Sequence, residues 1–218
     1  DGGSRKIYLV DNPYQTGDRA VIDGNLTNLN QLLFYGRDGG SELRITGSVD
    51  CAYLKVNNGA DVTIEGVLTN TGALYPEYTG GKLTLNGNAT VGGPVQMNGG
   101  ELALGPNCVF SNGGTFVVKN AAGKLSGSGR IDLNGQNLDL QDGTIAPGNS
   151  VGTLTVAGGE LQMSGSMIYE WEIGQPGPDQ SDTIDIVGGL LDLDNFKLQL
   201  LDDDGYVEFA TDKLDLFT

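Results

Sequence analysis

Two carboxylates, Glu170 and Glu172, are separated by one residue in the segment IYEWEI, whose alternating pattern predicts a β-strand. Side chains two residues apart in a strand share a face, at a distance of about 6.6 Å. That separation lies at the lower end of the range for inverting glycoside hydrolases, and Trp171 could stack on a sugar ring. The same alternation also fits a strand with its glutamates in solvent and its aromatic residues in a core. We favour this second interpretation and keep the three residues as candidates for a carbohydrate-binding site.

A run of three aspartates, Asp202, Asp203 and Asp204, is the best candidate for a metal site. Carboxylate oxygens are the hard ligands that suit Ca²⁺. The spacing matches neither an EF-hand loop nor the glycine-rich calcium nonapeptide. The acidic residues before this run alternate with Ile and Leu, which is typical of a strand with one face in solvent. We therefore expect the fold to need no cofactor, with Ca²⁺ at this run as the alternative.

The composition excludes several kinds of chemistry. The 218 residues include no histidine, which excludes catalytic triads with a histidine base and histidine-ligated zinc. Ser150 lacks the G-x-S-x-G frame of a nucleophile elbow. Lys and Arg number 12 against 28 Asp and Glu, for a net charge of −16, so nucleic acid is not an expected partner. Arg130 and Asp132 could belong to a lyase-type site, but one such pair is more typical of a protein surface.

Glycine is abundant, with 36 residues, and predicts a fold rich in turns. Short runs of alternating apolar residues, each ending at Gly or Asn, recur without helical periodicity, which predicts an all-β protein. Four of these runs begin at Leu43, Val62, Leu83 and Leu102, at nearly equal intervals. The repeating unit of about 20 residues is the size of one solenoid turn. The sequence therefore predicts a single-stranded parallel β-helix, and a β-sandwich built from Asn-Gly hairpins remains the alternative.

The N-terminal segment, residues 1–40, departs from this pattern. The segment at 28–36, NLNQLLFYG, is bulkier than the repeats and could form a short helix. Because a solenoid needs an atypical end to cover its first turn, we predict an N-terminal cap over residues 1–40. Residues 41–218 would then form the β-helix repeat domain, and the two parts would make a single structural domain.

The segment at 143–159, GTIAPGNSVGTLTVAGG, carries a family resemblance together with the strand and the Ser-Asp pair that follow it. The motif residues are Pro147, Gly148, Asn149, Ser150, Gly152, Leu154, Val156, Gly158, Ser181, Asp182 and Gly188. Over about residues 143–201 the chain resembles autotransporter passenger domains and the related autotransporter-associated β-strand repeat proteins. The resemblance implies a right-handed β-helix that is exported to a bacterial cell surface or secreted. Because no membrane barrel follows in this sequence, we expect at most a passenger piece.

Fold and resemblance together predict a structural or adhesive module without catalysis, in which Pro147, Gly148, Asn149 and Ser150 form a structural turn. Its expected partners are molecules of a host or neighbouring cell surface, or a polysaccharide, and we expect no insertion into a membrane. A carbohydrate-active β-helix and a trimeric receptor-binding spike are the alternatives. An enzyme should show facing carboxylates in a groove, whereas a structural module should not.

Two features of the sequence bear on stability. Residues 1–130 have a net charge of −1, and residues 131–218 have a net charge of −15, so the acidity belongs to the segment that carries the resemblance. Cys51 and Cys108 either close a long loop as a disulfide or remain two buried thiols.

Overall fold

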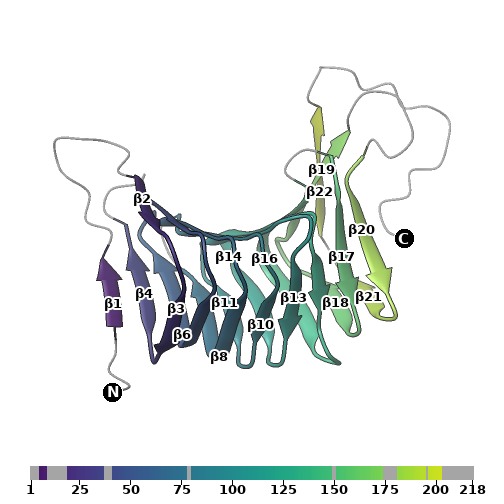
Figure 1. The fold of residues 1–218 in the computed structure, drawn as a ribbon. Helices are drawn as coiled ribbons and strands as arrows, with labels where there is room; N and C mark the ends of the chain where they lie inside the picture. Colours follow the sequence, from purple (N-terminus) through teal and green to yellow (C-terminus); the bar gives the residue numbers. More distant parts are fainter. Residues whose placement is uncertain are drawn as a thin grey trace.

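In the computed structural model, parallel strands wind around one continuous core, and successive turns of the chain lie side by side (Figure 1). The structure describes residues 5–8, 19–36, 41–77, 80–148, 151–173, 181–194 and 196–202. All 22 strands lie in one hydrogen-bonded network, and every pairing of named strands in this part of the chain is parallel. The described residues include no helix that is long and apolar enough to cross a membrane. The predicted parallel β-helix is therefore confirmed.

The strands stack into three ladders, which we number in the order in which the chain crosses them after residue 18. Ladder 1 contains β2 (Arg19–Ile22), β5 (Glu42–Ile45), β7 (Asp61–Ile64), β9 (Lys82–Leu85), β12 (Glu101–Leu104), the second halves of β14 (Phe116–Gly127) and β16 (Asn137–Pro147), β19 (Ile168–Ile173) and β22 (Lys197–Asp202). Leu43 pairs with Val62, Val62 with Leu83, and Leu83 with Leu102. These pairings confirm that the four runs occupy equivalent positions in successive turns.

Ladder 2 follows ladder 1 in every turn. It contains β3 (Leu26–Leu29), the first halves of β6 (Val49–Asn57) and β8 (Leu68–Pro76), β10 (Ala89–Val91), β13 (Val109–Asn112), β15 (Arg130–Asp132), β17 (Thr153–Ala157) and β20 (Thr183–Val187). Ladder 3 contains β1 (Arg5–Tyr8), β4 (Leu32–Tyr35), the second halves of β6 and β8, β11 (Val95–Met97), the first halves of β14 and β16, β18 (Glu160–Met163) and β21 (Leu190–Leu193).

The core is built from residues that alternate along each strand. In β5, for example, Leu43 and Ile45 are buried while Arg44 is exposed. Stacking these inward side chains from turn to turn forms one apolar cluster, whose largest members are Phe34, Phe110, Phe116, Tyr169 and Trp171. Because each turn has an apolar side that only its neighbours can cover, burial in the stack is what stabilises a turn.

Glycine columns at the corners allow the turns to stack closely. A Cβ atom on Gly66 would lie 2.5 Å from the carbonyl carbon of Gly47, and one on Gly87 would lie 2.3 Å from the carbonyl oxygen of Gly66. These positions therefore exclude any side chain. The high glycine content is explained in part by corners of this kind.

The short helix considered for residues 28–36 is absent, and that expectation is wrong. Asn28 and Leu29 end β3, and residues 32–35 form β4. The side chains of Leu32 and Phe34 point into the core, and β4 pairs with β1 and β6. These contacts favour a strand over the helical alternative. The cap boundary at residue 40 stays a prediction, because residues 37–40 lie outside the described part.

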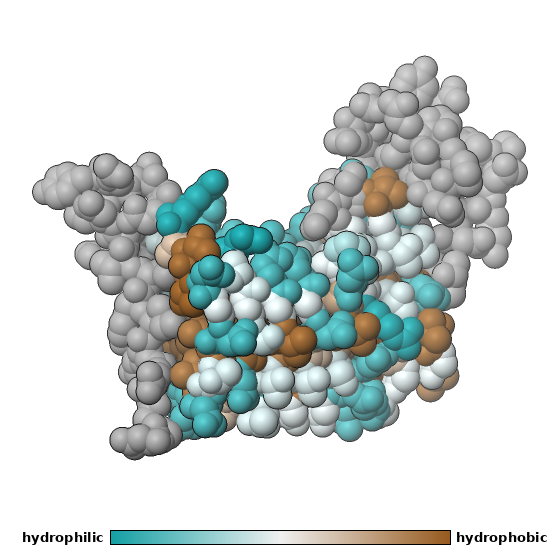
Figure 2. Space-filling view, viewed as in Figure 1, coloured by the Kyte–Doolittle hydropathy of each residue, from teal (hydrophilic) through white to brown (hydrophobic). Residues whose placement is uncertain are grey.

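The outer surface of the stack is mixed in character over the face that Figure 2 shows. Hydrophilic and intermediate residues cover most of the described part of this face, and hydrophobic residues interrupt them in small groups. The exposed large apolar side chains in the described part of the chain include Val21, Val67, Val187 and Leu190. Most of the exposed apolar side chains gather on β20, β21 and β22, the last described turn of the stack, which carries Val187, Leu190, Leu193, Leu198 and Leu200.

Candidate functional site

Glu170 and Glu172 lie on the outer side of β19, as the alternation predicts. The Glu170 carboxylate accepts a hydrogen bond from Lys124 Nζ at 2.7 Å, which joins β19 to β14 across the intervening strand β16. Both partners are partly exposed, so the pair contributes little net stability. Glu170 is thus already engaged by a cation of this chain.

Trp171 and Tyr169 lie on the inner side of the same strand. Tyr169 is fully buried, and Trp171 is 1% exposed. The indole Nε1 of Trp171 donates a 2.7 Å hydrogen bond to the main-chain oxygen of Asp182. A ring held in the core in this way cannot stack on a sugar from solvent, so the predicted platform is not accessible. Carbohydrate binding by Glu170 and Glu172 themselves stays a prediction.

Asp182 is the most deeply buried carboxylate in the described part of the chain, at 2% exposure. One carboxylate oxygen accepts a hydrogen bond from the Gly152 amide, and the other accepts one from the Glu172 amide, each at 2.9 Å. Gly152 precedes β17 and Glu172 lies in β19, so this side chain joins the two segments. Asp182 therefore acts as a clamp within the segment that carries the family resemblance.

Burial has a direct effect on the acidity of this clamp. The pKa of Asp182 is raised from 3.8 to about 6, chiefly by burial and to a lesser extent by the nearby charges of Glu172 and Glu170. The two backbone amide donors oppose this rise in pKa, because they stabilise the ionised form. The sequence carries a signal for this burial. Asp182 alternates with Ile184 and Ile186, so a strand through these residues would place all three on the same, inner face.

The predicted structural turn lies next to this clamp. Pro147 ends β16, and Gly148 adopts a φ of +86°. The amides and carbonyls of Gly148 and Gly127 exchange two hydrogen bonds, of 2.9 and 3.2 Å. A Cβ atom on Gly152 would lie 2.8 Å from the Cα of Gly148, so the two glycines permit a close contact. Asn149 and Ser150 lie outside the described residues.

The structure does not describe the side chains of the aspartates that are predicted to bind Ca²⁺. Asp203 and Asp204 lie outside the described residues, as does the side chain of Asp202. Across the stretches that the structure describes, no three Cys, Asp or Glu side chains are grouped so that they could hold a metal ion. The calcium site therefore remains a prediction.

The sequence also singled out an Arg-Asp pair and two cysteines. Arg130 and Asp132 form an ion pair of 2.7 Å on the outer side of β15, and both are partly exposed. Cys51 and Cys108 are free and buried. Burial raises the pKa of Cys51 to about 12 and that of Cys108 to about 11. These thiols are core residues with little tendency to react.

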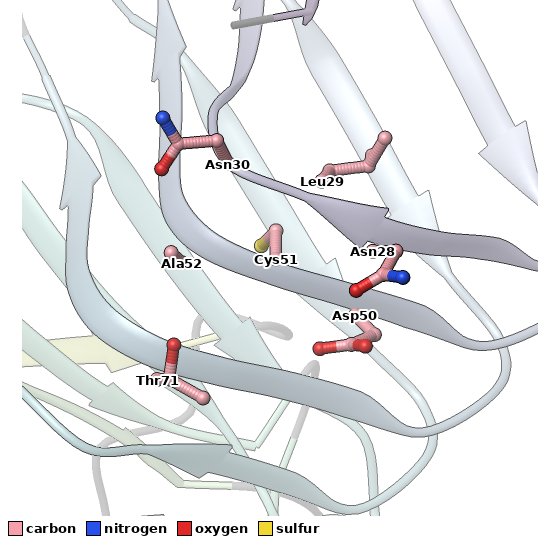
Figure 3. A pocket seen from close by; sticks show the side chains of 7 residues that line it. All are labelled: Asn28, Leu29, Asn30, Asp50, Cys51, Ala52 and Thr71. Atoms are coloured by element: carbon pink, nitrogen blue, oxygen red, sulfur yellow. The ribbon is translucent and has the colours of Figure 1, made fainter. Parts of the chain in front are cut away.

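A surface hollow of about 570 Å³ lies at the corner between ladders 2 and 3, near the N-terminal end (Figure 3). Its lining residues come from three successive turns: Asn28, Leu29, Asn30, Asp50, Cys51, Ala52 and Thr71. Figure 3 shows the polar side chains of Asn28, Asn30, Asp50 and Thr71 spread along these turns. Of the lining residues that the structure describes, Asp50 is the one acid, and none is basic. No sequence pattern pointed to this hollow, which depends on the register of the three turns.

One curated relative supports an extracellular setting. An extracellular serine protease of Serratia marcescens is 35% identical to this chain over 136 residues, which is 62% of this chain and 11% of the relative. The match thus covers about a tenth of the length of the relative. No protein-family model matches the chain, and no solved structure matches it.

Proposed function

We propose that this chain is an exported β-helical module with a structural and adhesive role, and that it performs no catalysis itself. The observation that carries the proposal is the uninterrupted stack of three parallel ladders around one core. Such a stack makes a long surface whose outer side chains can vary while the fold stays the same. The extracellular Serratia relative supports export, and its much greater length is compatible with a role for this segment outside the catalytic part.

Carbohydrate cleavage at Glu170 and Glu172 is less well supported. Hydrolysis needs a general acid and a second carboxylate placed around the substrate. In this structure Glu170 is paired with Lys124, and the neighbouring aromatic rings are buried. The outer surface near these residues therefore suits binding of a partner better than catalysis, and we do not propose that it hydrolyses glycosides.

The experiment couples the purified chain to latex beads and measures adherence to bacterial and epithelial cells. Beads coated with an unrelated acidic protein of similar charge are the control. A second assay measures release of reducing ends from neutral and acidic polysaccharides. We expect adherence above the control and no release. Turnover that is lost in Glu170→Gln would overturn the non-catalytic proposal, and adherence equal to the control would overturn the adhesive one.

A further inference from the structure

Two adjoining hollows form one groove at the corner between ladders 2 and 3, toward the C-terminal end. Their volumes are about 350 and 390 Å³, and they share Gly135 and Asn137 as lining residues. We call this surface the corner groove, and its side chains come mainly from β14, β16, β18 and β21. These strands are successive members of ladder 3. Because neighbouring strands lie about 4.8 Å apart, the four strands span about 14 Å along the stack.

Glycines create the concave shape of this groove. Gly135, Gly158 and Gly188 occupy equivalent corners of three turns, with φ of +82°, +68° and +62°. A Cβ atom on Gly135 or Gly188 would meet nothing within 4 Å, and one on Gly158 would meet a single atom at 3.8 Å. The corner is thus open where side chains would otherwise stand. The backbone there is accessible to a ligand.

Amide and carboxylate side chains line the wall of the groove. Asn137 and Asp139 point outward from β16, and Glu160 and Gln162 point outward from β18. The Glu160 carboxylate accepts hydrogen bonds from Asn137 Nδ2 at 3.3 Å and from Gln162 Nε2 at 3.2 Å. These contacts pre-position the three side chains, which reduces the entropy lost when a ligand is bound.

This set of groups selects a class of ligand. Amides offer both donors and acceptors, and carboxylates offer acceptors, which together match the hydroxyl groups of sugars. Leu190 is 68% exposed and adds apolar surface at one end of the groove, suited to the C–H face of a sugar ring. Among the described residues, the lining contains Asp139 and Glu160 but no Lys or Arg, so anionic polysaccharides would be repelled.

We propose that the corner groove binds a neutral polysaccharide, with the chain running along the axis of the stack. The inference rests on the proposed adhesive function and adds a class of ligand to it. Asn137, Glu160 and Gln162 would bind the hydroxyl groups, and Leu190 would contact a ring face. This surface is distinct from Glu170 and Glu172, which lie on ladder 1.

The test is affinity electrophoresis of the purified chain in gels that contain soluble β-glucan, mannan or dextran. Polygalacturonate and chitosan serve as the anionic and cationic comparisons. We expect at least one neutral polymer to retard the chain, both at low salt and at high salt. Asn137→Ala and Gln162→Ala should each weaken binding about fivefold, the effect of one lost hydrogen bond of about 1 kcal/mol. The matched control is Gln96→Ala, an outward amide of ladder 3 that does not line the groove.

Three results would overturn the inference. The first is that no neutral polymer retards the chain, and the second is that chitosan alone retards it and that high salt abolishes this effect. The third is that Gln96→Ala weakens binding as much as Asn137→Ala and Gln162→Ala do. Far-UV circular dichroism of each variant shows whether it is folded. The bead assay separates this inference from the proposed function. If beads carrying Asn137→Ala adhere as well as wild-type beads, the groove is not the adhesive surface, while the adhesive role stands. If wild-type beads fail to adhere, the adhesive role itself is wrong.

Discussion

The indole of Trp171 and the main chain of Asp182 are joined by a hydrogen bond of 2.7 Å inside the core. The side chain of Asp182 meanwhile accepts hydrogen bonds from the amides of Gly152 and Glu172. A single residue before β20 thus fixes the end of β19 and the start of β17. The part of the sequence that carries the family resemblance is therefore held by a polar contact as well as by apolar packing.

Replacing Trp171 with Phe should destabilise the fold. The main-chain oxygen of Asp182 loses its shorter hydrogen bond and the core loses part of the indole ring, so we expect a loss of at least about 1–2 kcal/mol in the free energy of unfolding. Urea denaturation followed by far-UV circular dichroism measures this loss. Tryptophan fluorescence cannot be used, because Trp171 is the single tryptophan and the variant lacks it. Tyr169→Phe removes a longer bond to the same oxygen, of 3.4 Å, and should cost less. Equal stability of Trp171→Phe and wild type would contradict the role of this contact.

The protonation of Asp182 should make the fold more stable in mild acid. Its pKa is about 6 in the folded chain and 3.8 in the reference state, so the folded state binds the proton more tightly. The stabilisation is complete below about pH 4 and is lost as the pH rises through about 6. We expect a decrease of roughly 1–3 kcal/mol in the free energy of unfolding between pH 4 and pH 7 from this group.

Urea titrations of wild type and Asp182→Asn at several pH values between 4 and 8 isolate this effect. The other acidic residues are common to both proteins, so their contribution cancels in the difference between the two curves. The variant should lack the part of the pH dependence that belongs to Asp182, whatever its overall stability. Parallel curves would show that Asp182 does not titrate in this range.

Much of the fold could be predicted from the periodic part of the sequence. Leu43, Val62, Leu83 and Leu102 occupy equivalent positions of ladder 1, and each of their strands starts after a corner marked by polar residues or glycine. Beyond Leu102 the apparent repeat becomes irregular, because β14 and β16 run through the corner between ladders 3 and 1, so that no break in the strand precedes their ladder 1 segments. The next equivalent positions, Leu125 and Ile145, lie inside those long strands.

The candidate sites were harder to predict. Alternation placed Glu170 outside and Trp171 inside, as the structure shows. The burial of Asp182 was missed, because its alternation with Ile184 and Ile186 is easily overlooked when the residue is one aspartate among many acidic residues. The corner groove could not be foreseen either. Asn137, Glu160 and Leu190 are in register with one another, but the intervals between them are longer than those of the regular repeat.

The glycine column at the corner between ladders 1 and 2 should not tolerate a methyl group. A Cβ atom on Gly66 would lie 2.5 Å from the backbone of Gly47, so Gly66→Ala must push adjacent turns apart. We expect a loss of more than about 2 kcal/mol in the free energy of unfolding. Gly113→Ala is the matched control, because its nearest atom would lie at 3.3 Å, and it should cost less. The prediction fails if urea denaturation gives the two variants the same midpoint.

The two cysteines should react only when the fold opens. Cys51 and Cys108 are 2% and 1% exposed, and burial raises both thiol pKa values well above the usual range. Since the thiolate is the reactive form, a disulfide reagent such as Ellman's reagent at mildly alkaline pH should label the native protein very slowly. In denaturant without reductant it should label both thiols of the chain. Rapid labelling of both thiols in the native protein would contradict this burial, and no labelling in denaturant would reveal a disulfide.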